Sequence, residues 1–439
     1  MFQSLSNSLK IPELRNRILF TLGMIIVFRI GTHIPTPGVD GATLMKAIPT
    51  SSEMFSFLNM FSGGALRRFS IFALGIAPYI NSSIIMQLLV YVIPYFEDLA
   101  KNQGEEGRKT INQYTRYGTV LIGALQALGI SYMLERVGAV PHAGWAFKLM
   151  AVITLTAGTS FIMWLGEQMT SRGIGNGISI LITVGILAGL PEAVMQYLAV
   201  FKSDNPLDYA AAAGLLLIIY VTILLIVYVQ DGVRKIPVQY AKRVVGRRVY
   251  GGQNTYIPLR VNQAGVIPVI FASSILMFPA MIFNWLRSTK FMEEYIQKYN
   301  FIDDLLGIFD YNTFSYLIIY VVLIIFFTYF YTAITFNIQE LADNMKKYGG
   351  FIPGIRAGQK TVEFLEKTTS RVTFAGGIFL SVIAVIPNLL IKYMSVNFYF
   401  GGTALLIVVG VAMDTMRQLE SHLVTRNYEG FMKKSKGLR

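Results

Sequence analysis

Cysteine is absent from this chain, and charged residues and histidines are scarce. Of 439 residues none is Cys, three are His and 14% are Asp, Glu, Lys or Arg, whereas ordinary soluble domains carry about 25% charged residues. The lack of cysteine excludes disulfide bonds, thiolate metal sites and a cysteine nucleophile. The low charge excludes a typical water-soluble domain.

Long apolar runs replace the missing charge. Hydrophobic residues make up 54% of the chain, and the mean hydropathy is +0.51. Many runs approach the roughly 20 residues that a helix needs to cross a bilayer, whereas a membrane β-barrel would show shorter, alternating segments. The sequence therefore predicts an all-α polytopic membrane protein.

Ten of these runs are expected to be transmembrane helices. They lie near residues 18–34, 71–94, 114–135, 146–168, 177–200, 209–230, 262–286, 312–337, 371–396 and 399–419. Residues 1–17 are charged and offer no small-residue cleavage site, so we expect no cleavable signal peptide. With the N-terminus in the cytosol, most of the 38 Lys and Arg residues fall in cytosolic segments, as the positive-inside rule requires. Both termini are then expected to be cytosolic.

The ten spans divide into an N-terminal half, residues 1–206, and a C-terminal half, residues 207–439. Between them the polar stretch FKSDNPLD contains the turn formers Asn205 and Pro206. Because each half has five spans, an odd number, two similar halves would lie in the membrane in opposite orientations, as in many transport proteins. Only the counting of spans supports this inverted pseudo-symmetry, since the sequence shows no convincing internal repeat.

Two long loops, residues 231–261 and 338–370, are expected on the cytosolic side. In the first, β-branched residues flank central glycines, which predicts a hairpin-like excursion. The second reads as a helix from Glu340 to Lys347, a breaker at GGFIPG and a resumed helix at TVEFLEKT. The loops are either solvated connectors or docking surfaces. Docking is favoured by their length and by four apolar side chains, those of Tyr240, Val245, Phe351 and Ile355.

Ionisable residues are nearly missing from the middle of the spans. Glu167, Asp231 and Asp414 lie near cytosolic ends, and Arg29 and His33 lie near the outer end of the first span. Snorkelling to water or capping of helix ends explains these positions. Ion-coupled carriers usually need counter-charges deep in the bilayer, and no metal-binding or catalytic constellation can be assembled here. We therefore predict no enzyme, no cofactor and no metal, and a passive conduit rather than a carrier.

Eight sequence blocks resemble the signature motifs of one family. They are RIGTHIPTPGVD (29–40), MFSGGAL (60–66), FALGIAPYINSSIIMQLL (72–89), LGEQMTSRGIGNGISI (165–180), RKIPVQYAKR (234–243), VNQAGVIPVIFASSI (261–275), GGFIPGIRAG (349–358) and FGGTALLIVVGVAMDT (400–415). In this order, and over nearly the whole chain, they are similar to the SecY family of central subunits of the bacterial protein-conducting channel.

The resemblance implies a channel in the bacterial cytoplasmic membrane. Such a channel translocates unfolded polypeptides across the membrane and releases membrane segments sideways into the phospholipid bilayer. The resemblance also implies the partner subunits SecE and SecG, and it implies that the SecA ATPase or a translating ribosome supplies the energy. Secretory and membrane polypeptides are the expected substrates.

A plug between the first two spans is also implied by the resemblance. It maps to a half-helix at residues 57–67 and to seven positions in it, namely Phe57, Leu58, Phe61, Gly63, Gly64, Leu66 and Arg67. A helix of this length extends only about 17 Å, which is too short to cross a bilayer but long enough to close a funnel. The glycine pair is expected to act as a hinge. The alternative is a helix that lies on the outer membrane surface.

Three further sets of residues carry over from the family. The pore ring is expected at Ile76, Ile80, Ile182, Ile270 and Ile407. A lateral gate, between spans two and three on one side and seven and eight on the other, is expected at Asn81, Gln126 and Asn262. Docking of the motor or the ribosome is expected at Arg243, Arg247, Arg248 and Arg356. Ala357 stands where the family usually has proline, which relaxes the backbone constraint at that loop tip.

Two other classes of function compete with this interpretation. A secondary transporter for a small solute would need an ionisable site near the middle of the membrane. A scaffold that only holds a cytosolic enzyme would need no conducting path. Ion conductance and ion-coupled solute flux separate the three classes.

Overall fold

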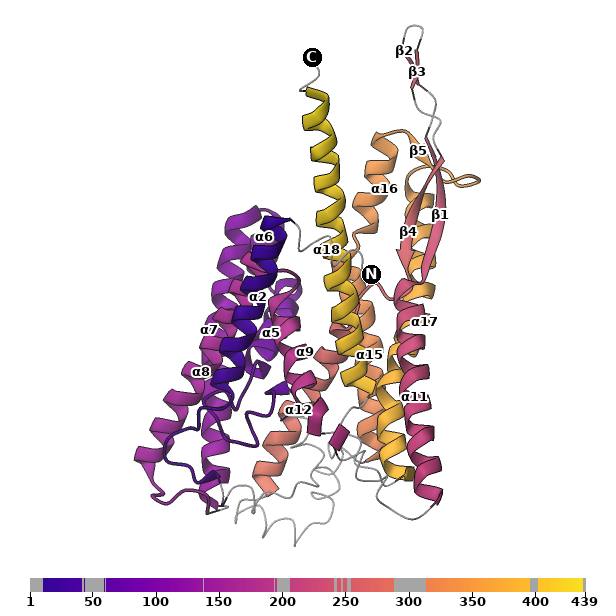
Figure 1. Cartoon of the computed structure of the whole chain (residues 1–439). Coiled ribbons are helices and arrows are strands. Elements are labelled where there is room, and N and C mark those ends of the chain that lie inside the picture. Colours follow the sequence, from indigo (N-terminus) through magenta and orange to yellow (C-terminus); the bar gives the residue numbers. More distant parts are fainter. Residues whose placement is uncertain are drawn as a thin grey trace. The chain divides into compact units, whose positions relative to one another are not determined.

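Helices make up most of the computed structural model of this chain (Figure 1). The structure describes residues 11–41, 43, 59, 61–136, 138–192, 194–195, 206–240, 243–245, 248–250, 254–287, 313–394 and 402–436. The chain divides into two units, each of which is described by itself. The first comprises Met1–Asp208, Ser274–Thr313 and Ile407–Arg439, and the second comprises Tyr209–Ser273 and Phe314–Leu406.

In the first unit the described residues form α2 (Pro12–Gly31), α5 (Ala77–Val92), α6 (Pro94–Lys101), α7 (Gly104–Arg136), α8 (Trp145–Arg172) and α9 (Gly177–Ala188). The second unit holds nearly all of α11 (Pro206–Asp231), together with α15 (Phe314–Thr335), α16 (Ile338–Lys347) and α17 (Gln359–Met394). Three helices contain a boundary between the units, namely α11, α12 (Ile267–Arg287) and α18 (Gly402–Lys436).

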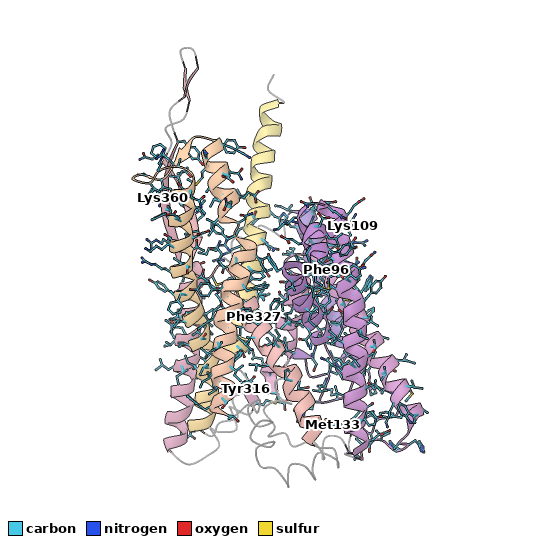
Figure 2. The ribbon with its side chains drawn as sticks, turned by 180° about the vertical axis from the view of Figure 1, so that it is seen from behind. Phe96, Lys109, Met133, Tyr316, Phe327 and Lys360 are labelled. Carbon is cyan, nitrogen blue, oxygen red and sulfur yellow. The ribbon has the colours of Figure 1, made fainter. Side chains whose placement is uncertain are left out.

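Each of the ten predicted spans overlaps one helix of the structure. Within the described residues, five helical stretches are long and apolar enough to cross a membrane, and the bent pair α5 and α6 raises the number to six. Figure 2 shows Lys109 near one end of the longest of the first unit's helices, α7, and Met133 near the other. The prediction of a helical, polytopic membrane protein is confirmed, while the arrangement of ten spans in two inverted halves stays a prediction.

The bend between α5 and α6 follows from one proline. Ile93 has an extended backbone, with φ −105° and ψ 117°, because Pro94 disfavours the helical conformation of the residue before it. The two helices meet at 98°. Beyond the bend α6 is short and polar, and Lys101 pairs with Glu97 one turn earlier at 2.6 Å. The apolar span therefore ends at Pro94.

Aromatic stacking fixes the segment that precedes α5 against two helices of its own unit. The ring of Phe72 stacks on Phe28 of α2, with centroids 6.2 Å apart, and on Phe161 of α8, with centroids 5.9 Å apart. A methyl group at Gly158 of α8 would lie 2.0 Å from the Ile71 carbonyl oxygen. Only glycine permits this close approach of the backbone to α8.

A small sheet forms in the second unit from residues of the two long loops. Strands β1 (Val233–Tyr240) and β4 (Asn254–Arg260) pair antiparallel, and the two-residue strand β5 (Gly350–Phe351) adds to the other edge of β1, in the order β4-β1-β5. The predicted hairpin excursion is confirmed, as is the predicted helix that is now α16. The sequence did not predict β5, which joins the two long loops.

The sheet and its neighbouring helices enclose a core of their own. It consists of the buried residues Ile236, Val238, Leu259, Met345, Ile352 and Leu365. Tyr240 and Ile355 are partly buried and pack against this core. This packing stabilises the loop itself, and the place of these two residues in a docking surface stays a prediction. Phe351 is exposed, and the side chain of Val245 lies outside the described residues.

Candidate functional site

The five predicted ring isoleucines are all buried. Their exposed fractions range from 1% at Ile407 to 5% at Ile270. Ile76 directly precedes α5, and the amide of Ile80 donates to the Ile76 carbonyl at 3.1 Å, so these two side chains share one helix face. Ile182 belongs to α9, which Asn176 caps by accepting hydrogen bonds from two backbone amides of the first turn. Ile270 belongs to the second unit and the other four to the first.

The described part of the predicted plug contacts the backbone beside two ring residues. A methyl group at Gly75, next to Ile76, would lie 3.0 Å from the Cα atom of Ser62. A methyl group at Gly63 would lie 3.2 Å from the Cα atom of Gly185. Gly185 follows Ile182 by about one turn of α9. Ser62 and Gly63 therefore lie against the two elements that carry Ile76 and Ile182.

The conformation of the plug differs from the predicted half-helix. Asn59 and Phe61 are helical, but residues 62–69 form turns, and Gly63 and Gly64 have φ angles of 68° and 84°. Such angles are left-handed and cannot continue a right-handed helix, so the prediction of helix was wrong for residues 62–67. The predicted positions Phe57 and Leu58 lie outside the described residues.

Asn59 stabilises the turn from within. Its carbonyl oxygen accepts a hydrogen bond from the Gly64 amide at 2.9 Å, and its side-chain oxygen accepts one from the Arg67 amide at 2.9 Å. The hydroxyl of Ser62 accepts from the Leu66 amide at 3.1 Å and donates to the Asn59 carbonyl at 3.0 Å. These local bonds satisfy backbone groups that the broken helix leaves unpaired.

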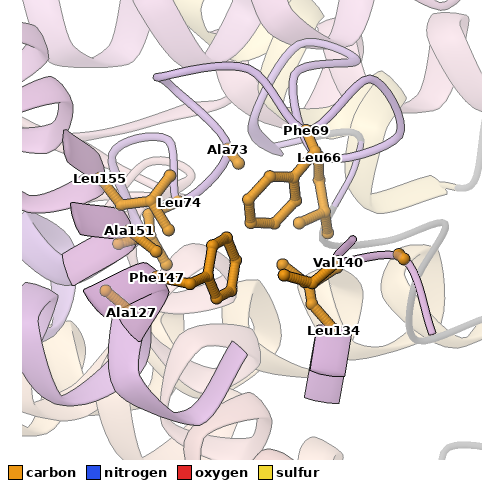
Figure 3. Packing of buried hydrophobic residues seen from close by; sticks show 11 residues of the cluster. Leu66, Phe69, Ala73, Leu74, Ala127, Leu134, Val140, Phe147, Ala151 and Leu155 are labelled. Carbon is orange, nitrogen blue, oxygen red and sulfur yellow. The ribbon is translucent and has the colours of Figure 1, made fainter. Parts of the chain in front are cut away.

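The C-terminal end of the plug is anchored in a hydrophobic cluster. Leu66 and Phe69 pack there with residues of α7, α8 and the loop between them, among them Phe147 and Leu155 (Figure 3). Burial of a side chain of this size contributes about 1.5–3 kcal/mol. The backbone also holds this end, because the Thr36 amide donates to the Phe69 carbonyl at 2.9 Å. Movement of the plug is therefore easiest before Leu66, at the glycine pair.

The predicted gate residues are buried and incompletely hydrogen-bonded. Asn81 and Gln126 of the first unit each have an amide nitrogen without a partner in the described part of the chain. Asn262 of the second unit donates to the Gly265 carbonyl at 3.0 Å, but its own side-chain oxygen has no partner there. Unpaired buried polar atoms are costly, and the role of these three side chains in a gate stays a prediction.

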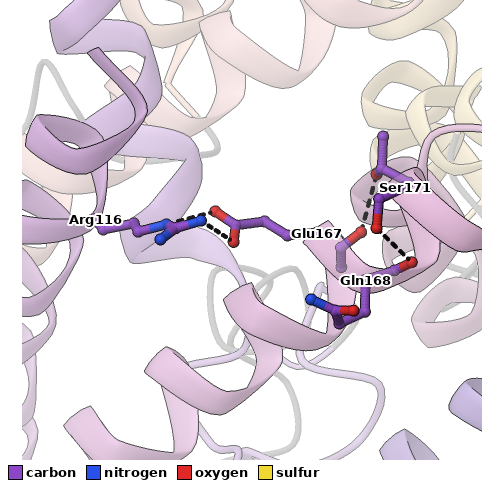
Figure 4. A network of polar contacts seen from close by, with 6 residues as sticks. Arg116, Glu167, Gln168 and Ser171 are labelled. Carbon is purple, nitrogen blue, oxygen red and sulfur yellow. Dashed lines mark hydrogen bonds and ion pairs between the residues drawn. The ribbon is translucent and has the colours of Figure 1, made fainter. Parts of the chain in front are cut away.

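Two ion pairs link α7 to α8. Arg116 of α7 binds Glu167 of α8 through two hydrogen bonds, with Nε–Oε1 at 3.0 Å and Nη2–Oε2 at 2.7 Å (Figure 4). Lys148 and Glu135 pair at 3.0 Å elsewhere between the same helices. Both pairs link α7 to α8, which gives Glu167 a structural role. Among the described residues, no group of three or more His, Asp or Glu side chains could hold a metal ion.

The predicted docking residues are only partly described. Arg356 is exposed between β5 and α17, and its carbonyl oxygen accepts a hydrogen bond from the Thr361 hydroxyl at 3.1 Å. Arg243 and Arg248 belong to the short paired strands β2 (Arg243–Val245) and β3 (Arg248–Tyr250), whose side chains are not described. Arg247 lies outside the described residues.

Two charged residues that contact the plug were missed from the sequence. The guanidinium of Arg29 donates to the Gly63 carbonyl at 2.9 Å, although snorkelling was the predicted role of this residue. Glu192 pairs with Arg67. These contacts join residues 34 and 125 positions apart, and no motif spacing signals them.

Comparisons with known proteins agree with the motifs. The family model for SecY matches residues 70–416. The protein translocase subunit SecY of Streptomyces scabiei is 46% identical, over 99% of this chain and 100% of the relative. A solved protein-conducting channel aligns with a TM-score of 0.63 and 18% identity, over 96% of this chain and 97% of that one. Sec61 in a canine ribosome-channel complex aligns with a TM-score of 0.62, 18% identity and the same coverage. At this low identity the two structures show that the fold is shared.

Proposed function

This chain belongs to the SecY family, and we propose that the path of the translocated polypeptide narrows at its five predicted ring isoleucines. The protein is a channel subunit of a protein translocase in a membrane, and it is not an enzyme. The proposed ring consists of Ile76, Ile80, Ile182, Ile270 and Ile407. Branched aliphatic side chains offer a passing chain no hydrogen bond, and a narrow apolar constriction disfavours water and ions.

The ten helices that overlap the predicted spans form, in this proposal, two inverted halves of five. The N-terminal half is residues 1–206 and the C-terminal half is residues 207–439. The overlap of each predicted span with one helix supports the number of spans. Both termini and the two long loops are proposed to lie in the cytosol of a bacterium, with the channel in the inner membrane. The bias of Lys and Arg toward these segments supports this orientation.

The main observation in support of the proposal is that the plug contacts two of the elements that carry ring residues. The segment around Ser62 and Gly63 lies against the backbone next to Ile76 and one turn after Ile182. An apolar turn at this place closes the path without crossing the membrane. The anchored end at Leu66 and Phe69 keeps the segment beside the path when the remainder moves.

The lateral gate is proposed at Asn81, Gln126 and Asn262. This assignment is carried over from the family motifs, and these polar side chains could hydrogen-bond across helices in the closed state. Such bonds are worth roughly 1 kcal/mol each inside a membrane. A hydrophobic signal sequence offsets this, because burial of one leucine-sized side chain yields about 1.5–3 kcal/mol. The substrate itself can therefore open the gate.

Docking of a partner is proposed at the cytosolic loops, with Arg356 as the main contact. Its exposed guanidinium suits RNA phosphates of a ribosome or acidic groups of the SecA motor, and Arg243, Arg247 and Arg248 would extend the basic surface. The canine structural neighbour is part of a ribosome-channel complex, which supports a ribosome as partner. SecE and SecG are proposed as companion subunits on the basis of the family.

Crosslinking of a stalled secretory chain tests the proposed path. A photoreactive residue is placed singly at Ile80, Ile182, Ile270 or Ile407, and the matched control is Ile153, an isoleucine of α8 that is 68% exposed. All four ring positions are expected to crosslink to the stalled chain, and Ile153 is not. Crosslinks at Ile153 with none at the ring would place the chain beside the bundle and overturn the proposal.

A further inference from the structure

The plug is held by two charged side chains that belong to other elements of its unit. Arg29, in the last turn of α2, donates from Nη1 to the Gly63 carbonyl at 2.9 Å. Gly63 is the first residue of the left-handed turn, with φ 68°. A hydrogen bond from a charged donor is stronger than one between neutral groups. Arg29 thus restrains the plug at the point where its backbone is able to bend.

The position of Arg29 is itself fixed by the end of α2. Its carbonyl oxygen accepts a hydrogen bond from the Thr32 hydroxyl at 2.7 Å and contacts the His33 ring nitrogen Nδ1 at 2.8 Å. The side chain of Phe28, on the preceding residue, stacks on Phe72, which belongs to the fixed segment before α5. These contacts hold the C-terminal end of α2 close to the segment that follows the plug. The guanidinium of Arg29 is therefore already positioned beside the Gly63 carbonyl.

Glu192 makes the second contact. Its carboxylate pairs with the guanidinium of Arg67, and both side chains are partly exposed, at 52% and 34%. Glu192 follows α9, the helix that carries Ile182. Arg67 lies directly after the buried Leu66. This ion pair therefore connects the C-terminal end of the plug to the residues that follow α9. Pairs this exposed are weak and break readily.

We propose that Arg29 and Glu192 are positioning residues that hold the plug in the closed channel and release it when a substrate displaces α9. This inference rests on the proposed plug. Movement of α9 would separate Glu192 from Arg67 and would shift Gly185 away from Gly63. The Arg29 bond and the contact of Ser62 with Gly75 would then still hold the turn.

Ion leak through the reconstituted translocase tests the proposal. Arg29→Gln is expected to raise the leak of the resting channel about tenfold, which corresponds to about 1.4 kcal/mol. Arg29→Lys keeps a charged donor and is expected to restore most of the seal. Arg67→Glu and Glu192→Arg are each expected to raise the leak, and the double variant, in which the charges are exchanged, should return it to within about twofold of wild type by restoring the pair.

Arg172→Gln is the matched control, because Arg172 is an exposed arginine in the last turn of α8. Its leak is expected to equal that of the wild type. Failure of the exchanged pair to lower the leak of the single variants would refute the role of Glu192, and equal leak in Arg29→Gln and wild type would refute that of Arg29. Deletion of residues 57–64 tests the plug assignment separately from the role of the positioning residues. If that deletion does not raise the leak, the plug assignment fails; if it does and the point variants do not, only the positioning residues fail.

Discussion

The substitution Gly63→Ala should unseat the plug, because it adds a methyl group where the backbone is both left-handed and crowded. Gly63 has φ 68°. The new methyl group would lie 3.2 Å from the Gly185 Cα atom and 3.4 Å from the Phe28 ring. Neither neighbour can yield easily, since one is the backbone of α9 and the other is stacked on Phe72. We therefore expect the closed conformation to lose stability relative to the open one.

Two contributions set the size of the effect. A left-handed backbone costs a residue other than glycine roughly 1–2 kcal/mol, which shifts the ratio of open to closed channels by about 5- to 30-fold. Overpacking against α9 adds typically about 1–3 kcal/mol. Gly64→Ala provides the matched control, because Gly64 has φ 84° and nothing lies within 4 Å of its added methyl group. It carries the strain without the clash.

Single-channel recording of the resting translocase measures both variants. Gly64→Ala is expected to open more often than wild type, and Gly63→Ala is expected to exceed Gly64→Ala by at least about fivefold, as a further 1 kcal/mol implies. Equal opening of the two variants would show that contact with α9 does not seat the plug. Wild-type behaviour of both would refute the reasoning altogether.

Three other substitutions test the supporting structure. Gly158→Ala is expected to lower the free energy of unfolding by about 1–3 kcal/mol through its clash with a backbone carbonyl, whereas Gly129→Ala, in open space on α7, should be neutral or stabilising; thermal unfolding in detergent compares them. Glu167→Gln breaks the partly exposed pair with Arg116 and should cost about 1 kcal/mol or less in the same assay, so a loss of several kcal/mol would contradict the role given to this pair. Arg356→Glu should impair SecA-driven export while the channel itself inserts normally into the membrane. Undiminished export would show that Arg356 is not part of the docking surface.

The positions of the helices were predictable because a bilayer imposes a minimum apolar length. The bend at Pro94 has a different cause, namely the restriction that a proline places on the backbone of the residue before it. The hairpin of β1 and β4 was predictable from its β-branched residues and central glycines. The two-residue strand β5 was not, because its pairing of Phe351 with Gln239 depends on residues far apart in the chain. For the same reason the sequence did not show that Tyr240 packs on the core of the loop.

The plug shows where local reasoning and family resemblance diverge. The glycine pair at 63 and 64 was expected to be a hinge, and its left-handed φ angles suit one. The half-helix implied by the family does not extend past Phe61 in this structure. Arg29 and Glu192 had no sequence signal, because a single long-range contact leaves no periodicity. Their partners became visible only when the fold brought them together.

The most direct test of whether the plug closes the path is an engineered disulfide bond that holds the plug in place and can be reduced. A methyl group at Gly75 would lie 3.4 Å from the Cβ atom of Ser62, close to the separation of about 3.5–4.5 Å found in disulfides. The chain contains no cysteine of its own, so Ser62→Cys combined with Gly75→Cys introduces its only thiols. Because Gly75 has φ 57°, the Gly75→Cys single variant measures the strain of the added side chain, and the reduced double variant is the reference for the disulfide. Translocation of a secretory precursor by the oxidised, disulfide-bonded channel is expected to stop and to resume on reduction. Normal translocation by the oxidised channel would contradict the account.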